Sequence, residues 1–134
     1  MSVQATLVHE ADCELEGWDE PAPGLVTWRT LFSGERTPTQ GLVQGVAEVR
    51  ATLETRPGLH RHAHAETYYI LSGRGVIDLD GEMRPLAPGD AVFIPSNAWH
   101  AAWSEGEAPL RILYTFAADA FDDVVYEYRD GTPG

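Results

Sequence analysis

Short apolar runs, many of them rich in β-branched and aromatic residues, recur along the chain between turns that contain glycine and proline. Runs of this length and composition are typical of β-strands. We expect strands over residues 25–32, 41–53, 59–64, 66–71, 76–79, 83–86, 91–94, 98–103, 110–116 and 124–128. Many short strands at regular spacing predict an all-β barrel or sandwich.

Three local patterns make this prediction more specific. The Asp80-Gly81 pair stands between two apolar runs and indicates a two-residue hairpin. Residues 91–94 are wholly apolar, so we expect that strand to be buried. Residues 33–40 should form a polar loop, and residues 117–123 could hold one helical turn.

The length of 134 residues predicts a single domain. Residues 1–24 are polar and acidic and end in a proline-rich break, so we interpret them as an N-terminal arm. The barrel itself should span residues 25–128, and residues 129–134 should form a tail.

The charge balance narrows the possible partners. Nine basic and 21 acidic residues give a formal charge of −12, which disfavours nucleic acid and anionic membranes as partners. No apolar stretch approaches the length of a membrane span, and the N-terminus lacks the features of a signal peptide. The single Cys13 excludes an internal disulfide. A cytoplasmic location is therefore expected.

Three of the five histidines fall within five positions, followed by a glutamate. Residues two apart on a strand share a face, so His60 and His62 should lie side by side, and His64 could join them. Imidazole nitrogens and carboxylate oxygens are usual ligands of divalent metals. The pattern predicts a metal site, although solvated histidines on an exposed strand would give the same spacing.

The series His60-x-His62-x3-Glu66-x6-Gly73, followed by Gly89, Pro95 and His100, resembles the two motifs of the cupin superfamily. The resemblance implies a double-stranded β-helix, which is a jelly-roll barrel. It also implies one divalent metal ion and assigns its ligands to His60, His62, Glu66 and His100.

The chain departs from the family pattern at three positions that are not ligands. Glu54 stands where a glycine is expected before the first histidine, Asn97 where glycine is common, and Ser104 where an asparagine often follows the last histidine. By the same match His64 falls in the spacer of the first motif.

Three histidines and a carboxylate suit Fe(II), Mn(II), Ni(II), Co(II) or Zn(II) without choosing among them. Such an open site can polarise a carboxylate, activate water or bind oxygen. Tyr68 lies two residues after Glu66 and should share its face, which would be the cavity. A nearby cation favours the phenolate, so Tyr68 is either a general base or an aromatic wall residue.

Residues 23–28, 97–101 and 119–126 resemble the small dimethylsulfoniopropionate lyases of the cupin class. That resemblance implies that a metal binds the substrate carboxylate and that Tyr68 removes the adjacent proton, giving dimethyl sulfide and acrylate. A cupin dioxygenase or isomerase is the alternative enzyme. A cupin that only binds a metal or small ligand is the alternative from another class.

The remaining aromatic residues suggest a wall and an interface. Trp28 is the candidate wall residue for a sulfonium cation, whereas Trp99 and Trp103 have the opposite parity to His100 and should face away. Tyr126 is either packing or a lid over the pocket. The apolar surface of the two tryptophans and residues 112–116 predicts a homodimer, which the arm could cross.

Overall fold

The computed structural model describes residues 4–19 and 22–130, which form eleven strands and two 3₁₀ turns. The elements in chain order are η1 (Glu10–Asp12), β1 (Leu15–Gly17), β2 (Val26–Phe32), β3 (Val43–Val49), β4 (His60–Arg61), β5 (Glu66–Ser72), β6 (Gly75–Leu79), β7 (Glu82–Leu86), β8 (Ala91–Ile94), β9 (His100–Ser104), β10 (Leu110–Phe116), η2 (Phe121–Asp123) and β11 (Glu127–Tyr128). The all-β class is confirmed.

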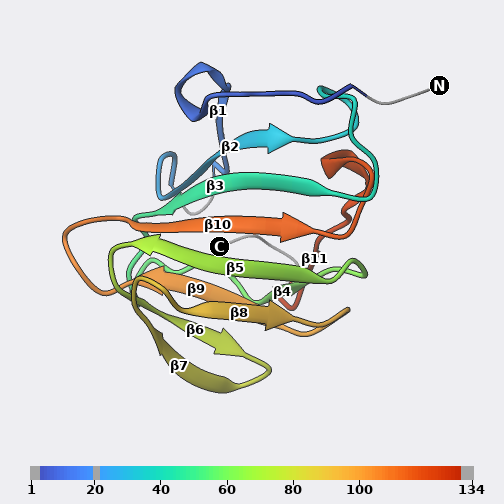
Figure 1. Ribbon diagram of the computed structural model, residues 1–134. Helices are drawn as coiled ribbons and strands as arrows, with labels where there is room; N and C mark the ends of the chain where they lie inside the picture. The colour runs from blue at the N-terminus through green and yellow to red at the C-terminus, as the bar shows by residue number, and fades with distance from the viewer. Residues whose placement is uncertain (1–3, 20–21, 131–134) are drawn as a thin grey trace.

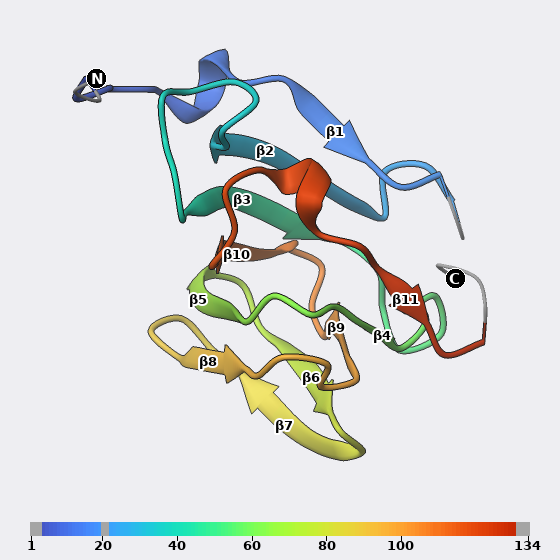
Figure 2. The same cartoon turned by 90° about the vertical axis from the view of Figure 1, so that its right-hand side faces the viewer.

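The strands form two antiparallel sheets that position the histidines. The six-stranded sheet has the order β1-β2-β3-β10-β5-β8, which runs from top to bottom in Figure 1. The five-stranded sheet has the order β11-β4-β9-β6-β7, and the turned view shows β11 beside β4 (Figure 2). His60 on β4 and His100 on β9 are direct register partners, while Glu66 opens β5 in the other sheet. The two sheets thus both contribute to the predicted ligand set.

The core lies between the inner faces of the two sheets. Its most buried large side chains, at most 1% exposed, are Ile70, Ile77, Ile94, Leu110 and Phe116. Alternate residues of β10 are buried, as expected for a strand with one face on the core.

The dimer was predicted from apolar surface at the two tryptophans and residues 112–116, and for most of these side chains that premise is wrong. Trp103, Ile112 and Phe116 are 3%, 2% and 1% exposed, so they are packed inside the monomer, whereas Trp99 is half-buried. The exposed apolar side chains of the sheets lie elsewhere, and among them are Tyr69, Leu71, Met83 and Phe93.

The prediction that residues 91–94 are buried is also wrong. Only Ile94 is buried, and Phe93 is 62% exposed. The reason is that one face of the six-stranded sheet is solvated, so successive side chains of β8 point alternately to the core, as Ile94 does, and to solvent, as Phe93 does.

Several element boundaries differ from the sequence expectation, while the hairpin is confirmed. The strand expected over 41–53 is the shorter β3, and the one over 124–128 is reduced to the two residues of β11. Residues 121–123 form a 3₁₀ turn. Asp80 (φ 51°) and Gly81 (φ 88°) both have positive φ, as a type I′ hairpin turn between β6 and β7 requires.

The expected arm joins the larger sheet, because β1 pairs with β2. Residues 1–3, 20–21 and 131–134, which belong to the predicted arm and tail, lie outside the described residues. The boundaries at residues 24 and 128 stay predictions. No helix in the described part of the chain is long and apolar enough to cross a membrane.

Candidate metal centre

The structure brings three of the four predicted ligands together. One ligand atom each of His62, Glu66 and His100 can be chosen so that all lie within 4.8 Å of one another. Nε2 of His62 lies 3.1 Å from Oε1 of Glu66, and Nε2 of His100 lies 3.6 Å from the same oxygen. All three side chains are buried, so this cluster could hold a metal ion.

Backbone carbonyls fix the orientation of every histidine in the site. The Nδ1–H of His60 donates to the Gly58 carbonyl, that of His62 to the His64 carbonyl, and that of His100 to the Ala98 carbonyl, at 2.7–2.9 Å. A carbonyl can only accept, so the proton of each neutral ring is on Nδ1 and the lone pair is on Nε2. Metal-binding histidines are usually oriented by such a partner.

The arrangement fits a cation. The Nε2 atoms of His62 and His100 both face the Glu66 carboxylate, so lone pairs converge on an anionic oxygen. Such a group needs a proton or a metal ion between its atoms, and Nε2 of His100 has no hydrogen-bond partner among the described residues. The orphaned, completely buried nitrogen is the observation that favours a metal.

His60 lies next to this group but outside the 4.8 Å set. Its ring centroid is 4.4 Å from that of His100. Burial, followed by the neighbouring His100, lowers the pKa of His60 to about 3. The ring is therefore neutral at physiological pH and has a free lone pair, which a fourth ligand requires. His64, as the cupin resemblance implied, is not part of the group.

A cavity between the sheets reaches Glu66 of the cluster and is lined by aromatic and small apolar side chains. His60, Glu66 and Tyr68 belong to its wall, and so does Trp28, as the sequence predicted. Trp99 and Trp103 point elsewhere, where Arg61 and Arg56 stack on their rings at 4.4 Å and 5.6 Å. The remaining aromatic wall residues are Trp18, Tyr114, Phe121 and Tyr126.

Three of these wall residues, Trp18, Tyr114 and Phe121, are not among the candidates that the sequence indicates. Trp18 lies in the acidic arm, and Tyr114 lies in the apolar run 110–116, where the sequence predicts only a strand. Tyr126, read as packing or a lid, has its ring centroid 5.5 Å from His60 and 5.3 Å from His62. The sequence signals for it are its place in the 119–126 stretch that resembles the lyases and the aromatic character of that stretch.

Gly45 is needed to place Tyr114 at the cavity. The two residues are register partners in β3 and β10. A Cβ atom at position 45 would lie 2.3 Å from the Tyr114 Oη and 2.7 Å from the Arg29 carbonyl oxygen. Only glycine therefore lets the phenol lie across β3.

Tyr68 lies on the cavity side of β5, with its ring centroid 6.4 Å from that of His100. Burial, and then the Glu66 carboxylate, raise the pKa of Tyr68 well above its ordinary value. The phenol is protonated at neutral pH unless a positive charge is placed near it. Burial likewise raises the pKa of Tyr126.

With this geometry in view, comparison with known proteins identifies the family. The cupin domain family matches residues 49–116, which include all four predicted ligands. The chain belongs to the cupin family. The two antiparallel sheets are those of the cupin jelly roll, and the fold predicted from the two motifs is confirmed.

Two curated relatives and one solved structure illustrate the similarity. The dimethylsulfoniopropionate lyase DddW of Ruegeria pomeroyi is 35% identical over 123 residues, covering 90% of this chain and 79% of the relative. A 1-methylthio-D-xylulose 5-phosphate methylsulfurylase of Rhodospirillum rubrum is 29% identical, with 81% and 76% covered. The polyketide cyclase RemF of Streptomyces resistomycificus superimposes with a TM-score of 0.77 at 22% identity, with 94% and 86% covered. The last shows the fold alone.

Proposed function

We propose that this cupin is a metal-dependent lyase that eliminates dimethyl sulfide from dimethylsulfoniopropionate. The observation that carries the proposal is the buried His62–Glu66–His100 cluster, whose Glu66 lines a cavity with a tyrosine in its wall. The 35% identity to a dimethylsulfoniopropionate lyase over most of both chains supports this choice among cupin activities.

His60, His62, Glu66 and His100 would hold one divalent ion. When bound, a divalent ion polarises a substrate carboxylate and favours the phenolate form of a nearby tyrosine. The protein's part is to present the Nε2 atoms of the three histidines, each ring being oriented by a backbone carbonyl that binds its Nδ1.

Tyr68 is the proposed general base, and its oxygen takes the proton from the carbon next to the carboxylate. The electron pair of that C–H bond forms the double bond of acrylate. The C–S bond breaks and its pair leaves with sulfur, so dimethyl sulfide is released. The raised pKa of Tyr68 makes its phenolate a strong base once it forms.

The proposal has a direct test. Purified protein, loaded separately with Fe(II), Mn(II), Co(II), Ni(II) or Zn(II), should release dimethyl sulfide from dimethylsulfoniopropionate with at least one ion, as measured by gas chromatography. Turnover of a different substrate with oxygen consumption would instead support a cupin dioxygenase. Absence of turnover with every ion, together with a small ligand that raises the melting temperature, would support a binding protein.

We also propose that the protein forms a two-fold homodimer through the β8 edge. Among the described strands, β8 ends the six-stranded sheet, and its Phe93 is 62% exposed. Tyr69 and Leu71 on the adjacent β5 are 46% and 41% exposed. Antiparallel pairing of two β8 strands would satisfy both edges and cover these side chains.

Phe93→Asp should therefore convert the dimer to a monomer, because it places two like charges across the two-fold axis. Light scattering at micromolar concentration gives the mass. Met83→Asp, a similarly exposed position at 56% on β7, is the matched control and should remain dimeric. A monomeric wild type would contradict the proposal.

A further inference from the structure

The arm contributes a side chain to the cavity. The indole of Trp18, one residue after β1, has ring centroids 5.7 Å from Trp28, 5.7 Å from His60 and 6.0 Å from Tyr126. Trp18 thus contacts residues from distant parts of the chain beside His60. Trp28 continues the same wall and stacks on Phe121 at 6.0 Å.

Several contacts fix the position of the arm. The Glu16 carboxylate accepts hydrogen bonds from the Thr30 hydroxyl at 3.0 Å and from two nitrogens of Arg36 at 2.9 Å. The backbone N–H of Trp18 donates to the Val26 carbonyl at 3.3 Å. These contacts hold Glu16 and Trp18 on the inner side of the sheet.

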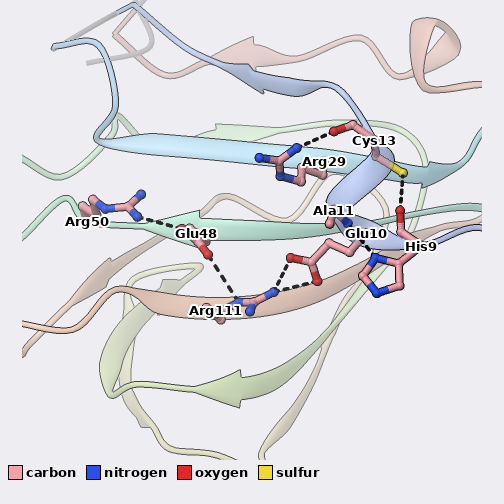
Figure 3. A network of polar contacts seen from close by, with 8 residues as sticks. All are labelled: His9, Glu10, Ala11, Cys13, Arg29, Glu48, Arg50 and Arg111. Carbon is pink, nitrogen blue, oxygen red and sulfur yellow. Dashed lines mark hydrogen bonds and ion pairs between the residues drawn. The ribbon is translucent and has the colours of Figure 1, made fainter.

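On the outer side of the same sheet, the preceding residues are held by a second set of contacts (Figure 3). Both Glu10 carboxylate oxygens accept from Arg111, at 2.7 Å and 2.6 Å, and Arg29 donates to the Cys13 carbonyl. The arm therefore passes around the β2 edge and is attached on both faces. Trp18 is placed by the fold rather than by a free end of the chain.

The charges of the cavity suit a cation and not an anion at the Trp18 end. Among the described residues, no lysine or arginine lines the cavity, and Glu66 of the cluster is its only acid. A ligand group beside Trp18 and Trp28 therefore meets aromatic faces and no counter-ion. Aromatic faces attract cations, and indole attracts them most strongly. A ligand group with a permanent positive charge should therefore bind here more tightly than a neutral group of the same shape.

We propose that Trp18 is a specificity-determining residue that, together with Trp28, selects ligands with a sulfonium or quaternary ammonium group. The inference rests on the proposed function for the placement of the ligand's carboxylate, and it adds the side chain that recognises the other end. The chain's own arm thus takes part in substrate choice.

The test compares two unreactive ligands of equal shape on the metal-loaded protein by calorimetry. One is 3-(trimethylammonio)propanoate, and the other is 4,4-dimethylpentanoate, in which carbon replaces the charged nitrogen. The wild type should bind the charged ligand about ten-fold more tightly. Trp18→Leu should lose most of that ratio, and Trp18→Phe should retain part of it.

Trp99→Phe, which alters an indole outside the cavity, should leave the ratio unchanged. Equal affinities in the wild type, or a ratio that persists in Trp18→Leu, would overturn the inference. If Trp18→Leu fails to fold, the test uses Trp18→Phe instead. An affinity ratio equal to that of the wild type in Trp18→Phe would also contradict the inference. A Trp18-dependent ratio without any release of dimethyl sulfide would refute the lyase and leave this inference standing.

Discussion

Tyr68→Phe should reduce the turnover of dimethylsulfoniopropionate by about 10²- to 10⁴-fold, because a positioned general base contributes about that much. The variant keeps the ring and its packing in the cavity wall, so the fold should be preserved. It also keeps all four predicted metal ligands, so metal content should equal that of the wild type. The measurements are initial rates of dimethyl sulfide release and metal analysis of the same samples.

The chain offers a matched control on the same strand. Tyr69 neighbours Tyr68 on β5 but points to the opposite face and is 46% exposed. Tyr69→Phe removes an identical hydroxyl and should leave turnover unchanged. Full activity in Tyr68→Phe would make Tyr68 a wall residue.

Tyr126→Phe tests which of the two tyrosines near the cluster, Tyr68 or Tyr126, is the general base. Tyr126 precedes β11, and its ring centroid is 5.5 Å from that of His60 and 5.3 Å from that of His62. If Tyr126→Phe abolishes turnover and Tyr68→Phe does not, the base is Tyr126. The elimination chemistry would then stand with a different proton acceptor.

The sequence predicts those parts of the fold that depend on local rules. Alternation and turn residues indicate the strands, and Asp80-Gly81 indicates the hairpin because few other pairs tolerate positive φ at both positions. The same period-two rule predicts that His60 and His62 share a face, where both rings contact His100, and that Trp99 points away from the site. Local geometry alone is sufficient for these features.

Features that depend on sheet order could not be predicted in this way. The prediction of a buried Phe93 is wrong because the outer face of the six-stranded sheet is solvated at β8, as it is at Tyr69 on the neighbouring β5. Trp18 lies in a polar stretch, and its place in the cavity wall depends on the pairing of Glu16 with Trp28, which no local pattern specifies. His100 is 34 residues from Glu66, and only the resemblance to a family joined them in advance.

His62→Ala and His100→Ala should each weaken metal binding by about 100-fold or more. Loss of even an orienting partner of a metal ligand typically costs 10- to 100-fold, and these substitutions remove a ligand itself. Metal content after dialysis, measured by mass spectrometry, and the absorption spectrum of the Co(II)-loaded protein would report the loss. Both readouts are independent of any substrate.

His64→Ala is the matched control, because His64 lies in the same histidine stretch but outside the cluster. His64 contributes to the site through its backbone carbonyl, which accepts the hydrogen bond from Nδ1–H of His62, and alanine retains that carbonyl. It should keep wild-type metal content. Wild-type affinity in both His62→Ala and His100→Ala would contradict the metal site altogether.

His60→Ala tests the fourth ligand, which the cupin resemblance implies and the 4.8 Å group leaves out. If the ion binds as proposed, the neutral His60 ring completes its coordination, so His60→Ala should lose affinity and change the Co(II) spectrum. If it loses neither, the site has three protein ligands, His62, Glu66 and His100. His60 would then serve as the aromatic contact between the cluster and Trp18, 5.7 Å away, and its loss would alter ligand affinity rather than metal affinity.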